Sequence, residues 1–322
     1  MSLCGRAARW GLGALLTGLV ATIPAAAEDY PAKTVTLVTL SSPGGGTDVF
    51  LREVIRHLGP IMGKTFVVVN TTGGGGAKAM AQVAQGPKDG SILLGTTGTL
   101  INTTVTSKVQ YGSKDMDWVV NFFLDPSLVY VRADSPIKTL QELVDYAKAN
   151  PGKLKYGLAT PTSQDRYAVE RLKRLTGTNI VAVPFEGGGE LLLSVLNGTL
   201  DVANGEPQEL MPQLAAGKIR ILATLTDERV SIFPEVKTAK EQGIDLSVIK
   251  FRGLSGPKNL PPEIKAAWAD ATRKLLADPA FKAWYEKSGL IPAVMNAEEY
   301  ETFIADFYKT QEDFFREIGV LK

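Results

Sequence analysis

The sequence predicts an α/β protein made of two lobes, and three observations lead to this class. Short apolar runs alternate with longer helical patterns from Thr34 onward, which is typical of strand-helix-strand units with parallel sheets. The chain has 322 residues, which is longer than one hydrophobic core usually organises. Polar, glycine-rich stretches fall between the predicted strands and helices, where ligands bind in open α/β sheets.

The chain begins with the features of a Sec-type signal peptide. Arg6 and Arg9 precede an apolar stretch over residues 11–23, and Ala25-Ala26-Ala27 follows as an Ala-x-Ala cleavage site. We therefore expect cleavage after Ala27, loss of residues 1–27 and export to the periplasm. A retained membrane anchor would need a longer apolar core of ~20 residues, so we expect a soluble mature protein.

The first series of elements precedes residue 100. Apolar runs predict strands over Thr34–Leu40, Thr65–Val69 and Ile92–Gly95. Helical periodicity predicts helices over Asp48–Leu58 and Ala77–Ala84. These elements alternate, so we expect one parallel sheet.

A second series begins at Leu128. Its predicted strands are Leu128–Arg132, Lys155–Leu158, Ile180–Val183, Leu200–Ala203 and Ile219–Ala223, and its predicted helices are Leu140–Ala149, Ser163–Leu175 and Glu190–Leu196. Thr139, three residues before Glu142, supports a capped start for the helix at Leu140.

Beyond Gly253 the pattern is almost wholly helical to Lys322. Pro261 and Pro262 open a long helix that runs through Leu276. These helices cannot form a lobe alone, so we expect them to pack on the first sheet. The predicted division is therefore residues 28–127 plus 254–322 for lobe 1 and residues 128–253 for lobe 2.

Composition argues against several functional classes. The net charge is +1 and Lys and Arg do not cluster among aromatic residues, so we expect no nucleic-acid partner. Cys4 leaves with the signal peptide and His57 is the single histidine, so a His/Cys zinc site cannot be assembled. We expect no metal, no cofactor and no catalytic residue, although carboxylate-only chemistry through Asp48, Asp165 or Glu206 stays open.

Three glycine-rich turns follow the first three predicted strands. They span Ser41–Asp48, Thr71–Ala77 and Gly95–Thr99. Consecutive glycines expose backbone N–H groups, and the following helix adds its positive dipole end, so each turn can act as an anion nest. A tight turn explains any one of them, but three at equivalent strand ends favour an anion site.

Nucleotide binding is not supported by these glycines. The stretch Gly73–Met80 lacks the Gly-Lys-Ser/Thr core of a phosphate-binding loop, and Gly44–Asp48 does not fit G-x-G-x-x-G. The expected anion is therefore not a nucleotide phosphate.

The second series offers further polar turns. The stretch Thr160–Arg166 supplies hydroxyls, an amide and a guanidinium, and Arg166 could grip a carboxylate with two N–H groups. The alternative for Arg166 is a surface ion pair with Asp165 or Glu170. Phe185 could cover a ligand or belong to the core.

These turns resemble those of the Bug receptors, the periplasmic solute-binding components of tripartite tricarboxylate transporters. The resemblance extends over nearly the whole mature chain and rests on short motifs in a specific order. They are Tyr30–Lys33, Gly44–Asp48, Gly90–Gly95, Ala149–Leu154, Val183–Gly188, Leu196–Asp201, Ala216–Arg220 and Leu276–Pro279. The resemblance implies a type II periplasmic-binding fold, in which turns 40–48 and 160–166 pinch a carboxylate in a central cleft between two lobes.

The sequence departs from the common pattern of that family at several positions. Pro43 replaces an alanine, Arg166 stands where histidine is frequent, and Gly205 stands where aspartate is frequent. Fixed cations at Arg166 and Arg252 would favour two or three carboxylates over an amino acid, so we expect a di- or tricarboxylate.

We therefore predict a monomer that captures a small organic carboxylate between closing lobes for the membrane permease of such a transporter. The alternatives are a sensory co-receptor that docks on a membrane sensor with an aromatic or amino-acid carboxylate, and a secreted carboxylate-dependent enzyme. The predicted ligand-binding residues belong to the turns described above and to the Phe251–Gly253 segment. They are Ser41, Ser42, Gly44, Gly45, Gly46, Thr47, Gly75, Gly76, Thr96, Thr97, Thr162, Ser163, Gln164, Arg166, Phe185, Glu206 and Arg252.

Overall fold

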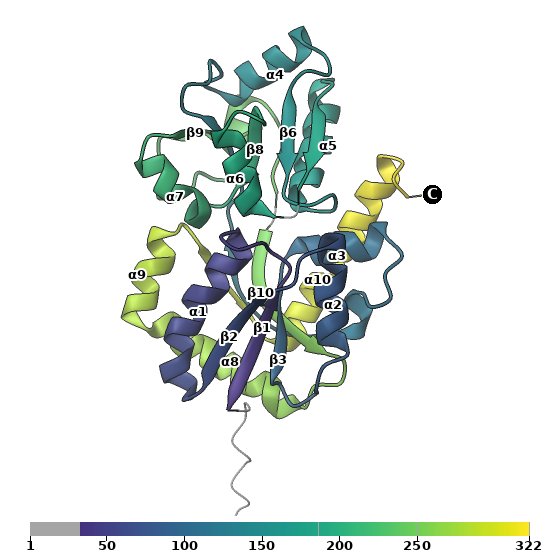
Figure 1. Ribbon diagram of the computed structural model, residues 1–322, viewed down its shortest axis with the longest axis vertical. Coiled ribbons are helices and arrows are strands. Elements are labelled where there is room, and N and C mark those ends of the chain that lie inside the picture. Colours follow the sequence, from purple (N-terminus) through teal and green to yellow (C-terminus); the bar gives the residue numbers. More distant parts are fainter. Residues whose placement is uncertain (1–32, 186, 249, 322) are drawn as a thin grey trace, which may run out of the picture.

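A computed structural model describes residues 33–185, 187–248 and 250–321 (Figure 1). The predicted signal peptide, its cleavage site after Ala27 and Cys4 lie outside the described residues. Over these three ranges, every helix is too short or too polar to cross a membrane.

The first sheet combines strands from both ends of the chain. Within the described residues it has six strands in the order β11-β4-β10-β3-β1-β2. These are β1 (Thr34–Thr39), β2 (Thr65–Asn70), β3 (Ile92–Thr96), β4 (Met116–Asp125), β10 (Lys250–Pro257) and β11 (Ile291–Met295). Strand β1 pairs in parallel with β2 and β3, and β10 runs antiparallel to β3 and β4. The turns after β1, β2 and β3 therefore emerge at one edge of the sheet.

Helices cover both faces of this sheet. They are α1 (Gly46–Met62), α2 (Ala77–Ala84), α3 (Gly98–Thr106), α8 (Pro262–Ala277), α9 (Pro279–Lys287) and α10 (Ala297–Glu317). Helices α1, α8 and α9 share an apolar core around Phe50, Trp268 and Phe281. Helix α10 packs with α3 around Phe251 and Tyr300, on the side of the sheet that Figure 1 shows to carry α2 and α3. The C-terminal helices thus cover the sheet that the N-terminal strands begin.

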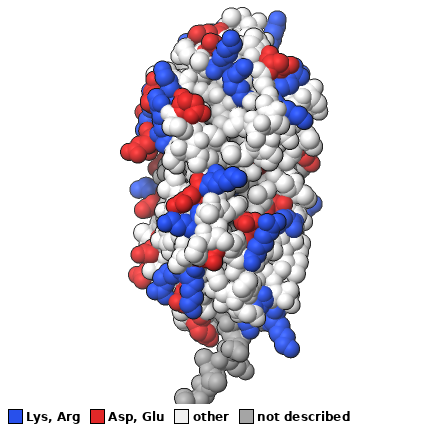
Figure 2. All heavy atoms as spheres, turned by 90° about the vertical axis from the view of Figure 1, so that its left-hand side faces the viewer, with Lys and Arg blue, Asp and Glu red and all other residues white. Residues whose placement is uncertain are grey.

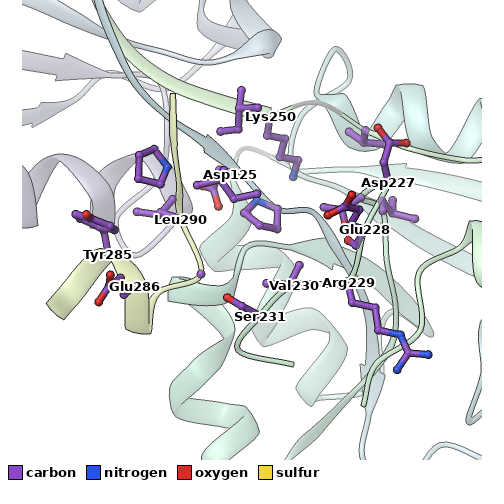
Figure 3. A pocket seen from close by; sticks show the side chains of 18 of the residues that line it. Asp125, Asp227, Glu228, Arg229, Val230, Ser231, Lys250, Tyr285, Glu286 and Leu290 are labelled. Atoms are coloured by element: carbon purple, nitrogen blue, oxygen red, sulfur yellow. Dashed lines mark hydrogen bonds between the residues drawn. The ribbon is translucent and has the colours of Figure 1, made fainter. Parts of the chain in front are cut away.

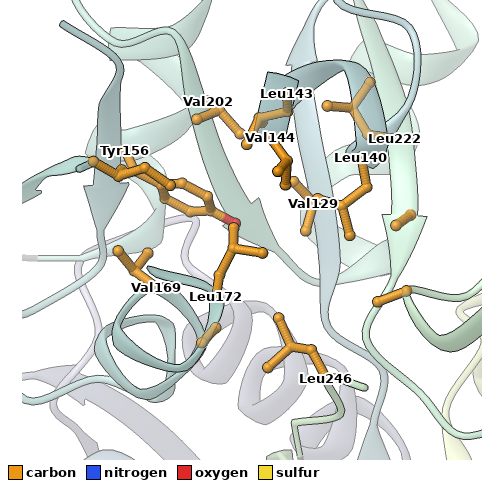
Figure 4. Close-up of a cluster of buried hydrophobic side chains, with 14 of the residues drawn as sticks. Val129, Leu140, Leu143, Val144, Tyr156, Val169, Leu172, Val202, Leu222 and Leu246 are labelled. Atoms are coloured by element: carbon orange, nitrogen blue, oxygen red, sulfur yellow. The ribbon is translucent and has the colours of Figure 1, made fainter. Parts of the chain in front are cut away.

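The second sheet has five strands among the described residues, in the order β7-β6-β8-β5-β9. These are β5 (Leu128–Arg132), β6 (Lys155–Leu158), β7 (Val181–Pro184), β8 (Val202–Gly205) and β9 (Ile219–Thr224). The accompanying helices are α4 (Leu140–Ala149), α5 (Gln164–Thr176), α6 (Gly188–Leu196) and α7 (Pro207–Ala215). One apolar core contains Leu140, Leu172 and Val202 (Figure 4), and another lies under α6 and α7.

Short 3-10 turns complete the list of regular elements, at η1 (Gly74–Gly76), η2 (Ser113–Asp115) and η3 (Lys240–Gln242).

Charged side chains are spread over the surface. On the face in Figure 2, Lys and Arg lie among Asp and Glu, and uncharged residues separate them.

The two sheets form the two lobes of the predicted α/β fold. The chain leaves the first sheet at Asp125, the last residue of β4, and enters the second at Leu128. The boundary predicted after residue 127 falls between these strands. The boundary predicted after Gly253 falls inside β10, because the pairing of β10 with β4 begins at Lys250.

The predicted strands and helices between Thr34 and Thr224 correspond to observed elements, with shifted ends, but β4, α3 and α7 are not predicted. Strand β4 is buried along nearly its whole length, so it lacks the alternation that marks a half-buried strand. The prediction of almost wholly helical structure beyond Gly253 is wrong at two places. Strand β10 continues to Pro257, and Ile291–Met295 forms β11 at the sheet edge, where proline is tolerated.

Candidate functional site

The first turns of several helices meet between the lobes, around a cavity of about 50 Å³. Among the described residues, it is lined from α1 and α3 of the first lobe and from α5, α6 and α7 of the second. The N-caps of α1, α3, α5 and α6 are Gly45, Thr97, Ser163 and Gly187, and in the described chain none of them makes a side-chain cap hydrogen bond. The first N–H groups of a helix lack intrahelical partners and lie at its positive end. The cavity is therefore suited to an anion.

The turn before α1 is fixed by the buried carboxylate of Asp48. This carboxylate accepts hydrogen bonds from Gly44 N–H at 2.9 Å, from Arg52 at 3.0 Å and from Asn70 at 2.8 Å. Burial acts to raise the pKa of Asp48, but these hydrogen bonds hold it below its ordinary value. Asp48 thus stays charged and shapes the turn.

Gly46, the first residue of α1, allows the second lobe to approach closely. A Cβ atom at this position would lie 2.3 Å from Glu206 Oε2 and 2.7 Å from Arg252 Nη2. Both distances are far below van der Waals contact. The glycine therefore permits a carboxylate of the second lobe to reach the N-terminus of α1.

The turn before α5 is fixed in a similar way by Asp165. Its carboxylate accepts hydrogen bonds from Ala159 N–H at 2.9 Å, from the Ser163 hydroxyl at 3.2 Å and from Lys250 Nζ at 3.0 Å. Asp165 is 1% exposed. Burial of a carboxyl group is costly unless it is hydrogen-bonded, and these partners join Asp165 both to the turn before α5 and to the first lobe.

Two buried cations on β10 connect the lobes. Lys250 Nζ lies 2.5 Å from Glu206 Oε1 and 3.0 Å from Asp165 Oδ1. Burial acts to lower the pKa of Lys250, but the two carboxylates raise it above its ordinary value. Lys250 is therefore a firmly charged bridge between the first sheet and the second lobe.

Arg252 has its own set of partners. Its Nε donates to Asp125 Oδ2 at 2.7 Å, its Nη1 donates to Thr47 Oγ1 at 2.8 Å, and its Nη2 lies 3.5 Å from Glu206 Oε1. Arg252 is 3% exposed. Burial raises the pKa of Asp125 despite the opposing effect of Arg252.

Glu206 and Glu209 form a buried acidic pair at the start of α7. The N–H of Glu206 donates to Glu209 Oε2 at 3.0 Å, which is half of a capping box. Burial, followed by the negative charge of Glu206, raises the pKa of Glu209 well above its ordinary value. Burial acts in the same direction on Glu206, but Lys250, the hydrogen bond with Glu209 and Arg252 lower its pKa. Glu206 is therefore ionised while Glu209 favours the neutral acid.

Eight of the predicted ligand-binding residues line the cavity. They are Ser41, Gly46, Thr47, Thr97, Ser163, Gln164, Glu206 and Arg252. The structure thus brings together the polar turns that follow β1, β3 and β6, together with Glu206 after β8 and Arg252 on β10.

The other predicted residues lie outside the cavity lining, and they are Ser42, Gly44, Gly45, Gly75, Gly76, Thr96, Thr162, Arg166 and Phe185. Thr96 bonds to the Tyr300 hydroxyl at 2.5 Å, and Thr162 bonds to Thr103 across the lobes at 2.6 Å. Phe185 packs against the core under α6 and α7.

Arg166 does not line the cavity. Its Nε lies 3.3 Å from Glu170 Oε1 and its Nη1 donates weakly to the Pro161 carbonyl at 3.4 Å. This is the surface ion pair that the sequence left as the alternative. The premise that Arg166 and Arg252 offer free guanidinium groups to a ligand is therefore not met in this arrangement.

Lys250 and Glu209 line the cavity but are absent from the predicted set. Two signals in the sequence could have identified them. Lys250 precedes Arg252 by two residues on one strand, so both side chains share a face. Glu209 follows Glu206 by three residues at a helix start, which is the spacing of a capping box.

A larger cavity of about 640 Å³ lies beside the connection at Leu124–Pro126 (Figure 3). It is lined by the loop at 225–231, by the end of α9 and by the start of β11, and Lys250 lines both cavities. None of the predicted ligand-binding residues belongs to its described lining. The smaller cavity is therefore the candidate site.

The residues considered for catalysis or metal binding have other partners. Asp48, Asp165 and Glu206 are held by the contacts given above, and His57 Nδ1 lies 3.0 Å from Asp278 Oδ1 on the far side of α1. Over the described residues, no group of three or more His, Cys, Asp or Glu side chains is arranged to hold a metal ion.

Comparison with known sequences gives matches over most of the chain. The family model described as "Tripartite tricarboxylate transporter family receptor" matches residues 50–320. The UPF0065 protein in the gbd 5' region of Cupriavidus necator is 30% identical over 319 residues, which covers 98% of this chain and 97% of that protein. The protein BugT of Bordetella pertussis is 26% identical over 301 residues, which covers 92% of each chain.

Comparison with solved structures gives matches of the same extent. A structure described as a periplasmic transporter superposes with a TM-score of 0.86 at 28% identity, over 90% of this chain and 99% of its own. Rpa4515 of R. palustris with adipate gives a TM-score of 0.86 at 25% identity, with the same coverage. MatC from Rhodopseudomonas palustris with bound malate gives 0.82 at 25% identity, over 88% of this chain and 99% of its own.

Proposed function

Because this chain belongs to the receptor family of the tripartite tricarboxylate transporters, we propose that it captures a small carboxylate in the periplasm between two closing lobes. The family consists of solute-binding receptors, so the proposed role is binding and delivery without chemical conversion. The proposed membrane partner is the permease of such a transporter. We further propose cleavage after Ala27 and action as a monomer.

The observation that carries this proposal is the convergence of uncapped helix N-termini from both lobes on one buried cavity. Helix N-termini bind anions through main-chain N–H groups and the helix dipole. Adipate and malate in the two R. palustris structures are carboxylates, which supports the same ligand class here. The small cavity favours a solute of few heavy atoms.

Lobe closure supplies the mechanism. A ligand that touches helix N-termini of both lobes gains those contacts only when the lobes are closed, so it shifts an open–closed equilibrium toward the closed form. The connections at 125–128 and around β10 are the proposed hinge. The partner would recognise the closed shape.

The sequence-based expectation of a di- or tricarboxylate ligand assumed free guanidinium groups at Arg166 and Arg252. Arg166 pairs with Glu170, and Arg252 pairs with Asp125 and Glu206. The ligand class that we propose is therefore the wider one, a small organic carboxylate.

Thermal denaturation of the mature protein against mono-, di- and tricarboxylates and aromatic acids tests the proposal. A true ligand at a hundred times its dissociation constant adds ~2.7 kcal/mol to the free energy of unfolding. The absence of any stabilising carboxylate would refute the function. Deletion of the gene separates transport from sensing, because a transport receptor is needed for uptake itself, whereas a sensory co-receptor is needed for induction of transport.

A further inference from the structure

The cations that line the cavity are already engaged by carboxylates of the protein. Among the described residues that line it, the cations are Lys250 and Arg252 and the acids are Asp165, Glu206 and Glu209. Each cation already contacts two carboxylates, since Asp125 holds Arg252 from outside the cavity. A ligand anion therefore finds no cation among these residues that lacks a carboxylate partner.

Glu206 and Glu209 also lie close to two of the converging helix starts. Glu206 Oε2 lies against Gly46 at the start of α1, where a Cβ would be 2.3 Å away. Glu209 Oε1 lies equally close to the Cβ position of Gly188 at the start of α6. Acidic side chains of the protein thus lie beside two of the converging helix starts.

The starts of α3 and α5 present uncharged polar side chains to the cavity, and Asp165 in the first turn of α5 is already bonded to Lys250. Thr97 and Thr99 reach the cavity from α3, and Ser163 and Gln164 reach it from α5. The two starts adjoin, since a Cβ on Gly98 would lie 2.7 Å from Gln164 Nε2. This position bridges the lobes and suits one carboxylate.

Buried polar atoms without a partner among the described residues indicate the rest of the ligand. Three such atoms belong to residues that line the cavity: Thr160 Oγ1, Asn204 Nδ2 and Glu209 Oε1. Thr160 and Asn204 are 5% and 3% exposed. A buried polar group without a partner is costly, so these atoms are positioned for a polar ligand. The Glu209 oxygen is an acceptor once its carboxyl group ionises, and it lies beside the charged Glu206.

Resting on the function proposed above, we infer that the solute is zwitterionic, with one carboxylate at the starts of α3 and α5 and one ammonium group facing Glu206 and Glu209. An ammonium group stabilises the ionised form of Glu209 and donates to its oxygen that has no partner among the described residues. A second carboxylate in that place would meet two glutamates and no available cation. Glu206 and Glu209 are thus specificity-determining residues against di- and tricarboxylates.

Matched ligand pairs test this inference on the wild-type protein. Glycine, β-alanine and 4-aminobutyrate are compared with acetate, propionate and butyrate, and with succinate, glutarate and adipate, by thermal denaturation and titration calorimetry. We expect at least one amino-carboxylate to bind at least tenfold more tightly than its analogue without the amine and than the dicarboxylates. Tight binding of a dicarboxylate with none of the amino-carboxylates would overturn the inference and leave the proposed function intact. Absence of binding by every carboxylate would defeat both.

Glu209→Gln provides the second arm. It keeps the shape of the side chain but cannot acquire a negative charge, so the preferred amino-carboxylate should lose at least tenfold in affinity while its analogue without the amine is unaffected. Glu190→Gln, on the exposed first turn of α6 outside the cavity lining, is the matched control and should change neither affinity. Equal affinities of wild type and Glu209→Gln for the amino-carboxylate would overturn the assignment of the ammonium position.

Discussion

Replacing Arg252 by methionine removes the central cation between the lobes while it retains most of the apolar side-chain volume. The variant loses the hydrogen bonds from Arg252 to Asp125 and Thr47 and the longer contact with Glu206. A hydrogen bond to a charged group contributes about 1.5 to 3 kcal/mol, and removal of one partner of a buried ion pair costs about 3 to 5 kcal/mol. We expect a loss of that size in the free energy of unfolding at pH 8.

The cause of this loss makes it dependent on pH. Without Arg252, the buried Asp125 keeps, among the described residues, only the donor Gln208 at 2.7 Å, so its pKa should rise further above its ordinary value. An acid whose pKa is raised in the folded state destabilises the fold as pH rises from its unfolded pKa to its folded pKa, by about 1.4 kcal/mol per pH unit. The variant should therefore be closer to wild type at pH 5 than at pH 8.

Urea unfolding followed by circular dichroism at the two pH values measures the effect. Arg252→Met/Asp125→Asn should recover part of the stability, because the second substitution removes the uncompensated carboxylate. Lys258→Met is the control, since Lys258 is 47% exposed and its ion pair with Asp117 should be worth less than about 1 kcal/mol. An equal loss at both pH values, with no recovery in the double variant, would refute the reasoning.

Three further predictions concern single substitutions in the site and in the core. Gly46→Ala should force Glu206 from its place beside Lys250, at a cost of about 1.5 to 3 kcal/mol to the closed form, and small-angle scattering should detect separated lobes. In a Glu206→Ala background, Gly46→Ala should cause little further separation of the lobes. An equal separation in that background would contradict the steric explanation. The pKa of Glu209 is raised in the folded protein, so its contribution to the free energy of unfolding is complete below the ordinary pKa near 4.5 and is lost as pH rises. Glu209→Gln should therefore reduce the loss of thermal stability with rising pH. An unchanged dependence of the melting temperature on pH would contradict this expectation. Trp268→Ala, in the core between α1 and α8, should cost about 3 to 5 kcal/mol in urea unfolding, and a loss below 1 kcal/mol would show that the core collapses around the gap.

Ion pairs of the candidate site connect the two lobes, and they affect how the protein responds to solutes. Lys250 and Arg252 on the first sheet form ion pairs with Asp165 and Glu206 of the second lobe. Opening must separate these pairs. The affinity for a solute therefore depends on the free energy of the internal ion pairs as well as on that of the ligand contacts.

The sequence by itself determined the α/β class, most elements up to Thr224 and the presence of polar turns at strand ends. Apolar periodicity, glycine runs and cap residues are local signals, and they report what a short segment prefers. They fail for β4, which is buried without alternation, and for β11, an edge strand that contains Pro292.

Only the tertiary structure decided which charges meet. Arg166 and Arg252 look alike as free cations in the sequence, yet one pairs with Glu170 within its own helix and the other is buried among Asp125, Thr47 and Glu206. Ion pairing depends on distance in space and on burial, because both set how strongly two charges interact. Residues far apart along the chain become neighbours only when the two sheets come together. The carboxylate partners of Arg252 therefore could not be predicted from the order of the residues.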